Sequence, residues 1–240
     1  MDGYDELGEF HDLFMDAAWE RLRPVLRAQF GSLTPSQLVL DIGAGTGIGT
    51  RVLASSTPAR ILAAEPSLTM RSVLTARVAD DPDLVERVSI VELPAPAVFE
   101  LLDEPIDGFV CAHMLGHLSV EVRRELLRGL AAHLTPGGNG VATVDRERST
   151  SEAAAEAVEE SRMLGELRYL ARHLPSEDGY LSEYEVWRGD RRLRQARFAG
   201  SWNPVSAADV IAEAAECGLV ARGSDGVLVI GRSPGGDADA

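Results

Sequence analysis

The 240-residue sequence contains no lysine, and all 23 of its fixed side-chain cations are arginines. This absence excludes P-loop nucleotidases, pyridoxal enzymes and Ser-x-x-Lys hydrolases, because each of these needs a lysine in its site. Cations are also in the minority, since 38 Asp and Glu residues give a formal net charge of −15. Binding to a nucleic-acid backbone depends on a basic surface, so we expect no nucleic-acid partner.

Cysteines and long apolar runs are equally scarce. Cys111 and Cys217 are too few for a disulfide framework. The acidic N-terminus lacks the apolar stretch of a signal peptide, and no apolar run approaches the ~20 residues of a membrane span. We therefore expect a cytoplasmic protein with no membrane segment. We also expect Cys111 to be a small buried strand residue, and Arg123 and Arg124 to be solvated.

Short apolar segments alternate with helical patterns in the first two thirds of the chain. Five segments have the composition of strands that are buried on both faces: 38–42, 60–64, 88–91, 108–112 and 140–144. Helical patterns occur at 47–55, 67–79 and 119–134. Strands that alternate with helices are typical of a parallel sheet covered on both faces.

The segments that flank this region predict additions to the sheet. Residues 4–30 form a helical pattern, in which Pro24 is expected to kink or split the helix. An Ala- and Glu-rich stretch predicts a long helix over 151–173. Two alternating runs, 181–188 and 192–202, are separated by a Gly-Asp pair and predict an antiparallel hairpin.

The final patterns along the chain predict a helix at 207–217, followed by two short strands at 219–222 and 227–230. Together these elements predict an α/β fold: a doubly wound, seven-stranded, mostly parallel sheet with a closing antiparallel strand. An N-terminal helical cap and an inserted hairpin complete it.

A glycine cluster follows the first predicted strand, in the run Asp41-Ile42-Gly43-Ala44-Gly45-Thr46-Gly47. Glycines between a strand and a helix allow a ligand to approach the backbone closely. The spacing is Gly-x-Gly-x-Gly and differs from the Gly-x-Gly-x-x-Gly of dinucleotide-binding proteins, which argues against a nicotinamide-dependent oxidoreductase. The second predicted strand ends in Glu65, where a carboxylate can accept hydrogen bonds from both hydroxyls of a ribose.

Four motifs in order give the chain a resemblance to the class I, Rossmann-like S-adenosylmethionine-dependent methyltransferases of the small-molecule type. They are the glycine run 41–47, the segment Ala64-Glu65-Pro66-Ser67 with Met70, the strand-four segment 106–118, and the segment 130–138. The resemblance covers about residues 38–144 and implies S-adenosylmethionine as the cofactor. It departs from the family after the third strand, where Glu92 follows Val91 in place of the usual aspartate.

The resemblance implies that the loops at the strand ends hold the cofactor. The backbone near Gly43–Gly45 and Ala112–His113 would face its amino-acid end, and Glu65 would hold its ribose. Asp41 would act mostly through the loop or a water molecule. The complete set of expected cofactor-binding residues is Asp41, Gly43, Ala44, Gly45, Gly47, Glu65, Pro66, Met70, Glu92, Leu93, Ala112 and His113. Pro66 and Met70 would cover the adenine, which Glu92 or the backbone of Leu93 would bind.

Catalysis needs a base only if the acceptor is a hydroxyl or a protonated amine. His117 is the first candidate for that base and His113 the second; the alternative for each is a polar residue at the rim of the sheet. Phe14, His117, Tyr180 and Tyr184 are expected to bind the substrate. For the two tyrosines, packing within the hairpin is the alternative. No metal site is expected.

These expectations divide residues 1–232 into parts of one methyltransferase domain. The parts are a helical cap (1–35), a cofactor-binding core (36–146), a lid of helix and hairpin (147–204) and closing elements (205–232), followed by a disordered tail (233–240). The expected activity is O- or N-methylation of a small molecule, in secondary metabolism. The alternative is a non-methylating member of the fold that binds the cofactor structurally or catalyses a rearrangement. The oligomeric state stays open, with a homodimer as one alternative.

Overall fold

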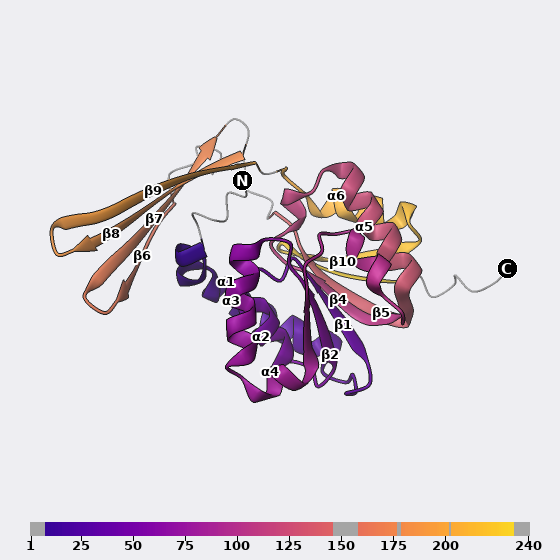
Figure 1. The fold of residues 1–240 in the computed structure, drawn as a ribbon. Coiled ribbons are helices and arrows are strands. Elements are labelled where there is room, and N and C mark those ends of the chain that lie inside the picture. Colours follow the sequence, from indigo (N-terminus) through magenta and orange to yellow (C-terminus); the bar gives the residue numbers. More distant parts are fainter. Residues whose placement is uncertain (1–7, 146–157, 177–178, 202, 233–240) are drawn as a thin grey trace. The chain divides into compact units, whose positions relative to one another are not determined.

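The computed structural model describes residues 8–145, 158–176, 179–201 and 203–232 (Figure 1). The chain divides into two compact units. The larger unit comprises residues 19–147 and 204–240, and the smaller unit comprises residues 1–18 and 148–203. The predicted disordered tail 233–240 and the predicted helix residues 151–157 lie outside the described residues. No helix in the described ranges is long and apolar enough to cross a membrane.

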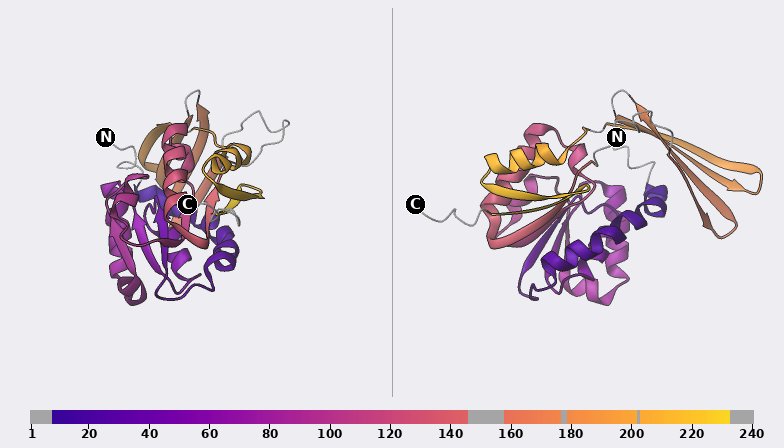
Figure 2. Two further views of the ribbon diagram at one scale, coloured as in Figure 1. Left: turned by 90° about the vertical axis from the view of Figure 1, so that its right-hand side faces the viewer. Right: turned by 180° about the vertical axis from the view of Figure 1, so that it is seen from behind.

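The larger unit is built on a seven-stranded sheet with the order β10-β11-β5-β4-β1-β2-β3. Its strands β1 to β5 are parallel to one another, whereas β11 is antiparallel to β5 and β10 is antiparallel to β11. The bounds are β1 Leu38–Ile42, β2 Arg60–Ala64, β3 Val88–Val91, β4 Ile106–Cys111, β5 Leu134–Thr143, β10 Leu219–Ser224 and β11 Val227–Arg232. The predicted α/β fold with a closing antiparallel strand is therefore confirmed, and Figure 2 shows this closing hairpin at the edge of the sheet.

Helices cover both faces of this sheet (Figure 1). The helices α5 and α6 contribute to one apolar core, and α2, α3, α4 and the second half of α1 contribute to the other. The bounds are α1 Gly8–Phe30, α2 Ile48–Ala54, α3 Leu68–Ala79, α4 Pro82–Arg87, α5 Val120–His133 and α6 Ala207–Glu216, with the short 3₁₀ turns η2 Ala97–Leu101 and η3 Leu115–His117. The helix α1 is not split at Pro24, and α4 was not expected from the sequence.

The strand β1 shows why the sequence of this unit is so apolar, since all five of its residues are buried. A strand between two helical layers has no solvent face, so both alternating sets of side chains must be apolar. Cys111 is buried at the end of β4, as expected, and its burial together with the nearby Asp41 raises the pKa of its thiol.

One buried ion pair joins the two helices of the closing side. Arg123 of α5 donates two hydrogen bonds of 2.6 Å to the carboxylate of Glu213 in α6, and both side chains are buried. The expectation that Arg123 is solvated was therefore wrong, because a bidentate carboxylate partner compensates for the loss of its hydration. Arg124, beside it, is paired with Glu216 at the surface.

The smaller unit contains an antiparallel sheet with the order β6-β7-β8-β9. Its strands are β6 Val158–Leu164, β7 Leu167–Ser176, β8 Gly179–Arg188 and β9 Arg191–Ser201. The expected hairpin of β8 and β9 is confirmed. The predicted helix over 151–173 was wrong over its described part, which forms β6 and β7. The physical reason is that pairing with β8 along the whole of β7 outweighs a local preference for helix.

Aromatic side chains form the core of the smaller unit. Phe10 of α1 is buried and stacks on Tyr184 of β8, with ring centroids 4.6 Å apart. Ala171 and Val186 complete the buried cluster, against which Phe14 packs. The first turns of α1 therefore lie on one face of this small sheet.

Candidate functional site

The candidate site begins in the loop between β1 and α2, at the carboxyl edge of the parallel strands. Gly43, Gly45 and Gly47 all have positive φ, which only glycine adopts readily. The backbone N–H groups of Gly43 and Ala44 donate to the carbonyl of Ala64, at 2.9 and 3.1 Å. These bonds hold the loop against the end of β2.

The carboxylate of Glu65 is buried and receives a hydrogen bond on each oxygen. The N–H of Gly45 donates to Oε2 and the N–H of Ser67 donates to Oε1, both at 2.8 Å. The two backbone bonds thus fix the carboxylate at the end of β2, beside the glycine loop.

Open space lies beside Gly45. A Cβ atom placed on Gly45 would meet no atom within 4 Å, whereas a Cβ on Gly47 would come within 2.5 Å of Leu74 Cδ1. The N–H groups of Gly43, Ala44 and Gly45 already donate to acceptors within the protein. A ligand can therefore approach the backbone closely at the open side of Gly45. A ribosyl ligand therefore fits this loop.

Asp41 lies behind the loop and is fully buried. Oγ1 of Thr50, in α2, donates a hydrogen bond of 2.7 Å to Oδ2 of Asp41. Burial raises the pKa of Asp41 to about 6, which the bond from Thr50 partly opposes and the charge of Glu65 reinforces. Asp41 therefore joins β1 to α2 and orients the loop from behind, in agreement with an indirect role.

The segment that follows β2 presents the other expected cofactor residues. Met70 is buried, whereas Pro66 is exposed, and the hydroxyl of Ser67 caps α3 by accepting from the N–H of Met70. Glu92 is exposed and forms an ion pair of 2.8 Å with Arg71. Leu93 is half-buried and packs against the core. Arg71 did not stand out in the sequence, because nothing local marks an arginine in a helix as a contact between two strand ends.

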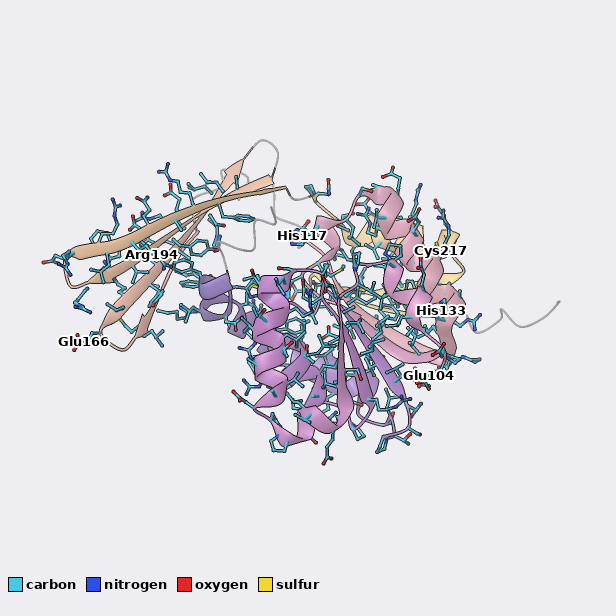
Figure 3. All side chains as sticks on the ribbon, viewed as in Figure 1. Glu104, His117, His133, Glu166, Arg194 and Cys217 are labelled. Carbon is cyan, nitrogen blue, oxygen red and sulfur yellow. The ribbon has the colours of Figure 1, made fainter. Side chains whose placement is uncertain are left out.

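The two candidate histidines lie in the loop after β4. His113 has a left-handed backbone (φ 57°), and its N–H donates to Thr143 Oγ1 at 2.7 Å, while its ring contacts the edge of Trp19. Ala112, before it, is buried. His117 is in the turn η3 and is exposed to solvent (Figure 3). Surrounding protein atoms desolvate its imidazolium and lower the pKa of His117, so its ring is neutral near pH 7.

Trp19 is a second residue whose place in the site did not stand out in the sequence. It is buried in the larger unit, and a Cβ on Gly49 would collide with its ring. Because Trp19 contacts both Gly49 and His113, it supports the walls of the site from within. The signal for this contact was Gly49 itself, a glycine inside a helix next to the glycine loop.

Two of the expected substrate-binding residues are described in the smaller unit. Tyr184 is buried in the aromatic core and stacks on Phe10, and burial raises the pKa of its hydroxyl. Phe14 lies 6.3 Å from the ring of Tyr184, between centroids. Tyr184 therefore packs within the sheet, as the alternative interpretation had it. The side chain of Tyr180 lies outside the described residues.

Comparisons with known proteins agree with the resemblance. Residues 39–138 match the family model of a methyltransferase domain. No curated protein sequence gives a significant match.

Solved structures share the fold over nearly the whole chain. DesVI of Streptomyces venezuelae has 16% identity and a TM-score of 0.69, covering 97% of this chain and 98% of its own. The sugar N-methyltransferase KedS8 of Streptoalloteichus sp. ATCC 53650 has 18% identity and a TM-score of 0.64, covering 89% and 86%. CalS10 of Micromonospora echinaspora, an amino pentose methyltransferase solved with S-adenosylmethionine, has 16% identity and a TM-score of 0.66, covering 91% and 92%. At these identities the likeness shows the fold.

Proposed function

From the match of residues 39–138 to the model of a methyltransferase domain, we propose that the chain transfers the methyl group of S-adenosylmethionine to an amine of a small molecule. The observation that carries the cofactor assignment is the carboxylate of Glu65, which is fixed by Gly45 and Ser67 beside the open side of the glycine loop. A carboxylate at the end of the second strand is the group that accepts hydrogen bonds from ribose hydroxyls.

The residues of the larger unit have defined parts in holding the cofactor. Glu65 binds the two ribose hydroxyls, and Gly45 leaves room for the ligand to pass close to the backbone. Met70 and Leu93 supply apolar surface for the adenine. Ala112 and His113, after β4, face the amino-acid end of the cofactor.

S-adenosylmethionine supplies an electrophilic methyl group bonded to a sulfonium sulfur. The protein has to hold a lone pair of the acceptor about 3 Å from that methyl carbon and to keep water away. A protonated amine has no lone pair, so it must first lose a proton. Because desolvation keeps the imidazole of His117 neutral near pH 7, His117 accepts this proton.

The choice of an amine rests on two observations. KedS8, a sugar N-methyltransferase, and CalS10, an amino pentose methyltransferase, share the fold over about nine tenths of the chain. The net charge of −15 attracts a cationic amine before it is deprotonated. A role in secondary metabolism and substrate binding by Phe14 and Tyr180 belong to the same proposal, whereas the ring of Tyr184 is taken up by its stacking on Phe10.

The test has two steps. Calorimetric titration with S-adenosylhomocysteine and with NADH should show binding of the first only. Incubation with S-adenosylmethionine and matched pairs of small sugars, which differ only in an amino or hydroxyl group, should then methylate the amino member. Methylation of the hydroxyl member alone would replace the amine by a hydroxyl as acceptor. Tight binding of NADH without S-adenosylhomocysteine would overturn the cofactor assignment.

The role of His117 is tested separately by His117→Ala. Loss of a general base is expected to lower turnover about 100-fold or more, with the affinity for S-adenosylhomocysteine unchanged. The fall in turnover at low pH, which protonation of His117 would cause, should also disappear. Undiminished turnover would mean that His117 accepts no proton during the reaction.

A further inference from the structure

The side chain of Arg71 joins two strand ends of the larger unit. It lies in the first turns of α3, with 13% of its side chain exposed. Its Nη1 donates hydrogen bonds of 2.9 Å to the backbone carbonyls of Glu65 and Pro66. Its Nη2 forms an ion pair of 2.8 Å with Glu92. One guanidinium therefore fixes the residue after β2 to the residue after β3.

The two carbonyls belong to the segment that carries the ribose-binding carboxylate. Gly45 and Ser67 orient the carboxylate group of Glu65, whereas Arg71 holds the backbone from which it extends. The planar fork of arginine bonds the two carbonyls through Nη1 and the carboxylate through Nη2, whereas a lysine would have to serve all three from a single nitrogen. The arrangement makes the position of Glu65 depend on a side chain that stands behind the site.

We propose that Arg71 is a positioning residue for the adenosine part of the cofactor, which rests on the proposed function. It acts through Glu65 on the ribose. Its pairing with Glu92 adds less, because the Glu92 side chain is 72% exposed and exposed ion pairs contribute little. The exposed Glu92 is thus a partner of Arg71, and its loss should matter less than the loss of the two backbone contacts.

The first test measures binding of S-adenosylhomocysteine by calorimetry. Arg71→Ala should raise the dissociation constant about 10-fold, which is the loss expected for hydrogen bonds to a charged donor. Glu92→Ala should raise it about 2-fold. Arg71→Lys should lie between Arg71→Ala and the wild-type protein.

A matched control exists at the opposite end of β2. Arg60 also donates to a backbone carbonyl, that of Ser36 at 3.0 Å, and forms an ion pair of 2.9 Å with Glu104. Glu104 precedes β4 and His117 follows it, so the two residues mark opposite edges of the sheet in Figure 3. Arg60→Ala should change the melting temperature by an amount similar to the change caused by Arg71→Ala. It should leave the dissociation constant for S-adenosylhomocysteine unchanged.

A ligand analogue separates positioning from a general loss of structure. If Arg71 acts through Glu65 on the ribose, Arg71→Ala should weaken the 2′-deoxy analogue of S-adenosylhomocysteine only about 2-fold, since part of the contact is already missing. An equal penalty for both ligands would overturn the inference, and so would unchanged binding of S-adenosylhomocysteine. If Arg71→Ala does not fold, Arg71→Lys is compared on the same two ligands. Failure of the wild-type protein to bind S-adenosylhomocysteine would instead overturn the proposed function.

Discussion

Each of the two units of the chain buries a carboxylate, and the pKa values of these two carboxylates shift in opposite directions. Asp41, in the larger unit, accepts a hydrogen bond from the hydroxyl group of Thr50, and burial raises its pKa to about 6. Glu185, in the smaller unit, is equally buried, but it accepts from the indole N–H of Trp187 and from Arg192, both at 2.8 Å. Burial alone would raise the pKa of Glu185, yet these partners hold it below its usual range. The pKa of a buried acid therefore depends more on its hydrogen-bond donors than on how deeply the acid is buried.

The difference extends to how each unit is held together. The larger unit relies on strands that are apolar on both faces, with few charged contacts in its core. The smaller unit has an aromatic core on one face of its sheet. Arg172 and Arg192 pair with Glu185 at strand positions that alternate with those of the aromatic core. The larger unit therefore depends on continuous apolar runs and the smaller one on cross-strand partners.

The largest expected effect concerns the one buried ion pair that joins α5 and α6. Arg123→Ala leaves the carboxylate of Glu213 buried without its partner, which should lower the free energy of unfolding of the larger unit by about 3–5 kcal/mol. Urea denaturation measures this. The adjacent Arg124→Ala, which removes an exposed pair with Glu216, should cost about 0–1 kcal/mol. Equal effects of the two substitutions would show that the burial of Arg123 contributes nothing.

The second prediction uses Asp41 and its pH dependence. Its folded pKa of about 6 lies above that of an unfolded aspartate, near 3.8, so its contribution to stability is complete below pH 4 and is lost as the pH rises through 6. Relative to Asp41→Asn, the wild-type protein should lose about 2 kcal/mol between pH 4 and pH 7. Unfolding curves at a series of pH values measure this difference.

Glu185→Gln is the matched opposite. Because its folded pKa is lowered, the stability that Glu185 contributes is present above the ordinary range of glutamate and is lost as the pH falls. The difference between wild-type protein and Glu185→Gln should therefore rise with pH, whereas the difference for Asp41→Asn falls. The same sign for both variants would refute the comparison.

The third prediction asks whether the units are independent. Phe10→Leu removes the stacking on Tyr184 and part of the buried surface, which should cost the smaller unit about 1–2 kcal/mol. Hydrogen exchange of β7 and β8 should become faster, while the affinity for S-adenosylhomocysteine stays unchanged. Faster exchange in β1 and β4 as well would show that the two units unfold as one.

The sequence predicted the larger unit well, because its signals are local. The parallel strands contain short, mostly apolar runs, and the glycines and Glu65 sit directly at strand ends. The contacts that support the site were not predictable in this way. Arg71 and Trp19 come from helices and reach the loops only after folding, and their sequence neighbours do not indicate where they point.

The smaller unit shows why local preference fails. Residues 158–173 are rich in Glu, Arg and Leu, which favour helix, yet they form β6 and β7. The neglected signal was Gly165, which stands in the middle of the predicted helix just as Gly189 stands between β8 and β9. Two glycine turns of the same kind, at the ends of strands that pair, would have favoured a four-stranded sheet over a helix and a hairpin.

Gly165 supplies the last prediction, because a turn and a helix at this position predict opposite signs for the effect of Gly165→Ala on stability. In the turn between β6 and β7 it has φ of 58°, and a Cβ would meet no atom within 4 Å, so Gly165→Ala should cost only the conformational strain of about 1–2 kcal/mol. In a helix the same substitution would stabilise by about 1 kcal/mol. Gly165→Asn, which tolerates this conformation, should be nearly neutral. Urea denaturation of the three proteins decides between the turn and the helix, and greater stability of Gly165→Ala would restore the helix that the composition favours.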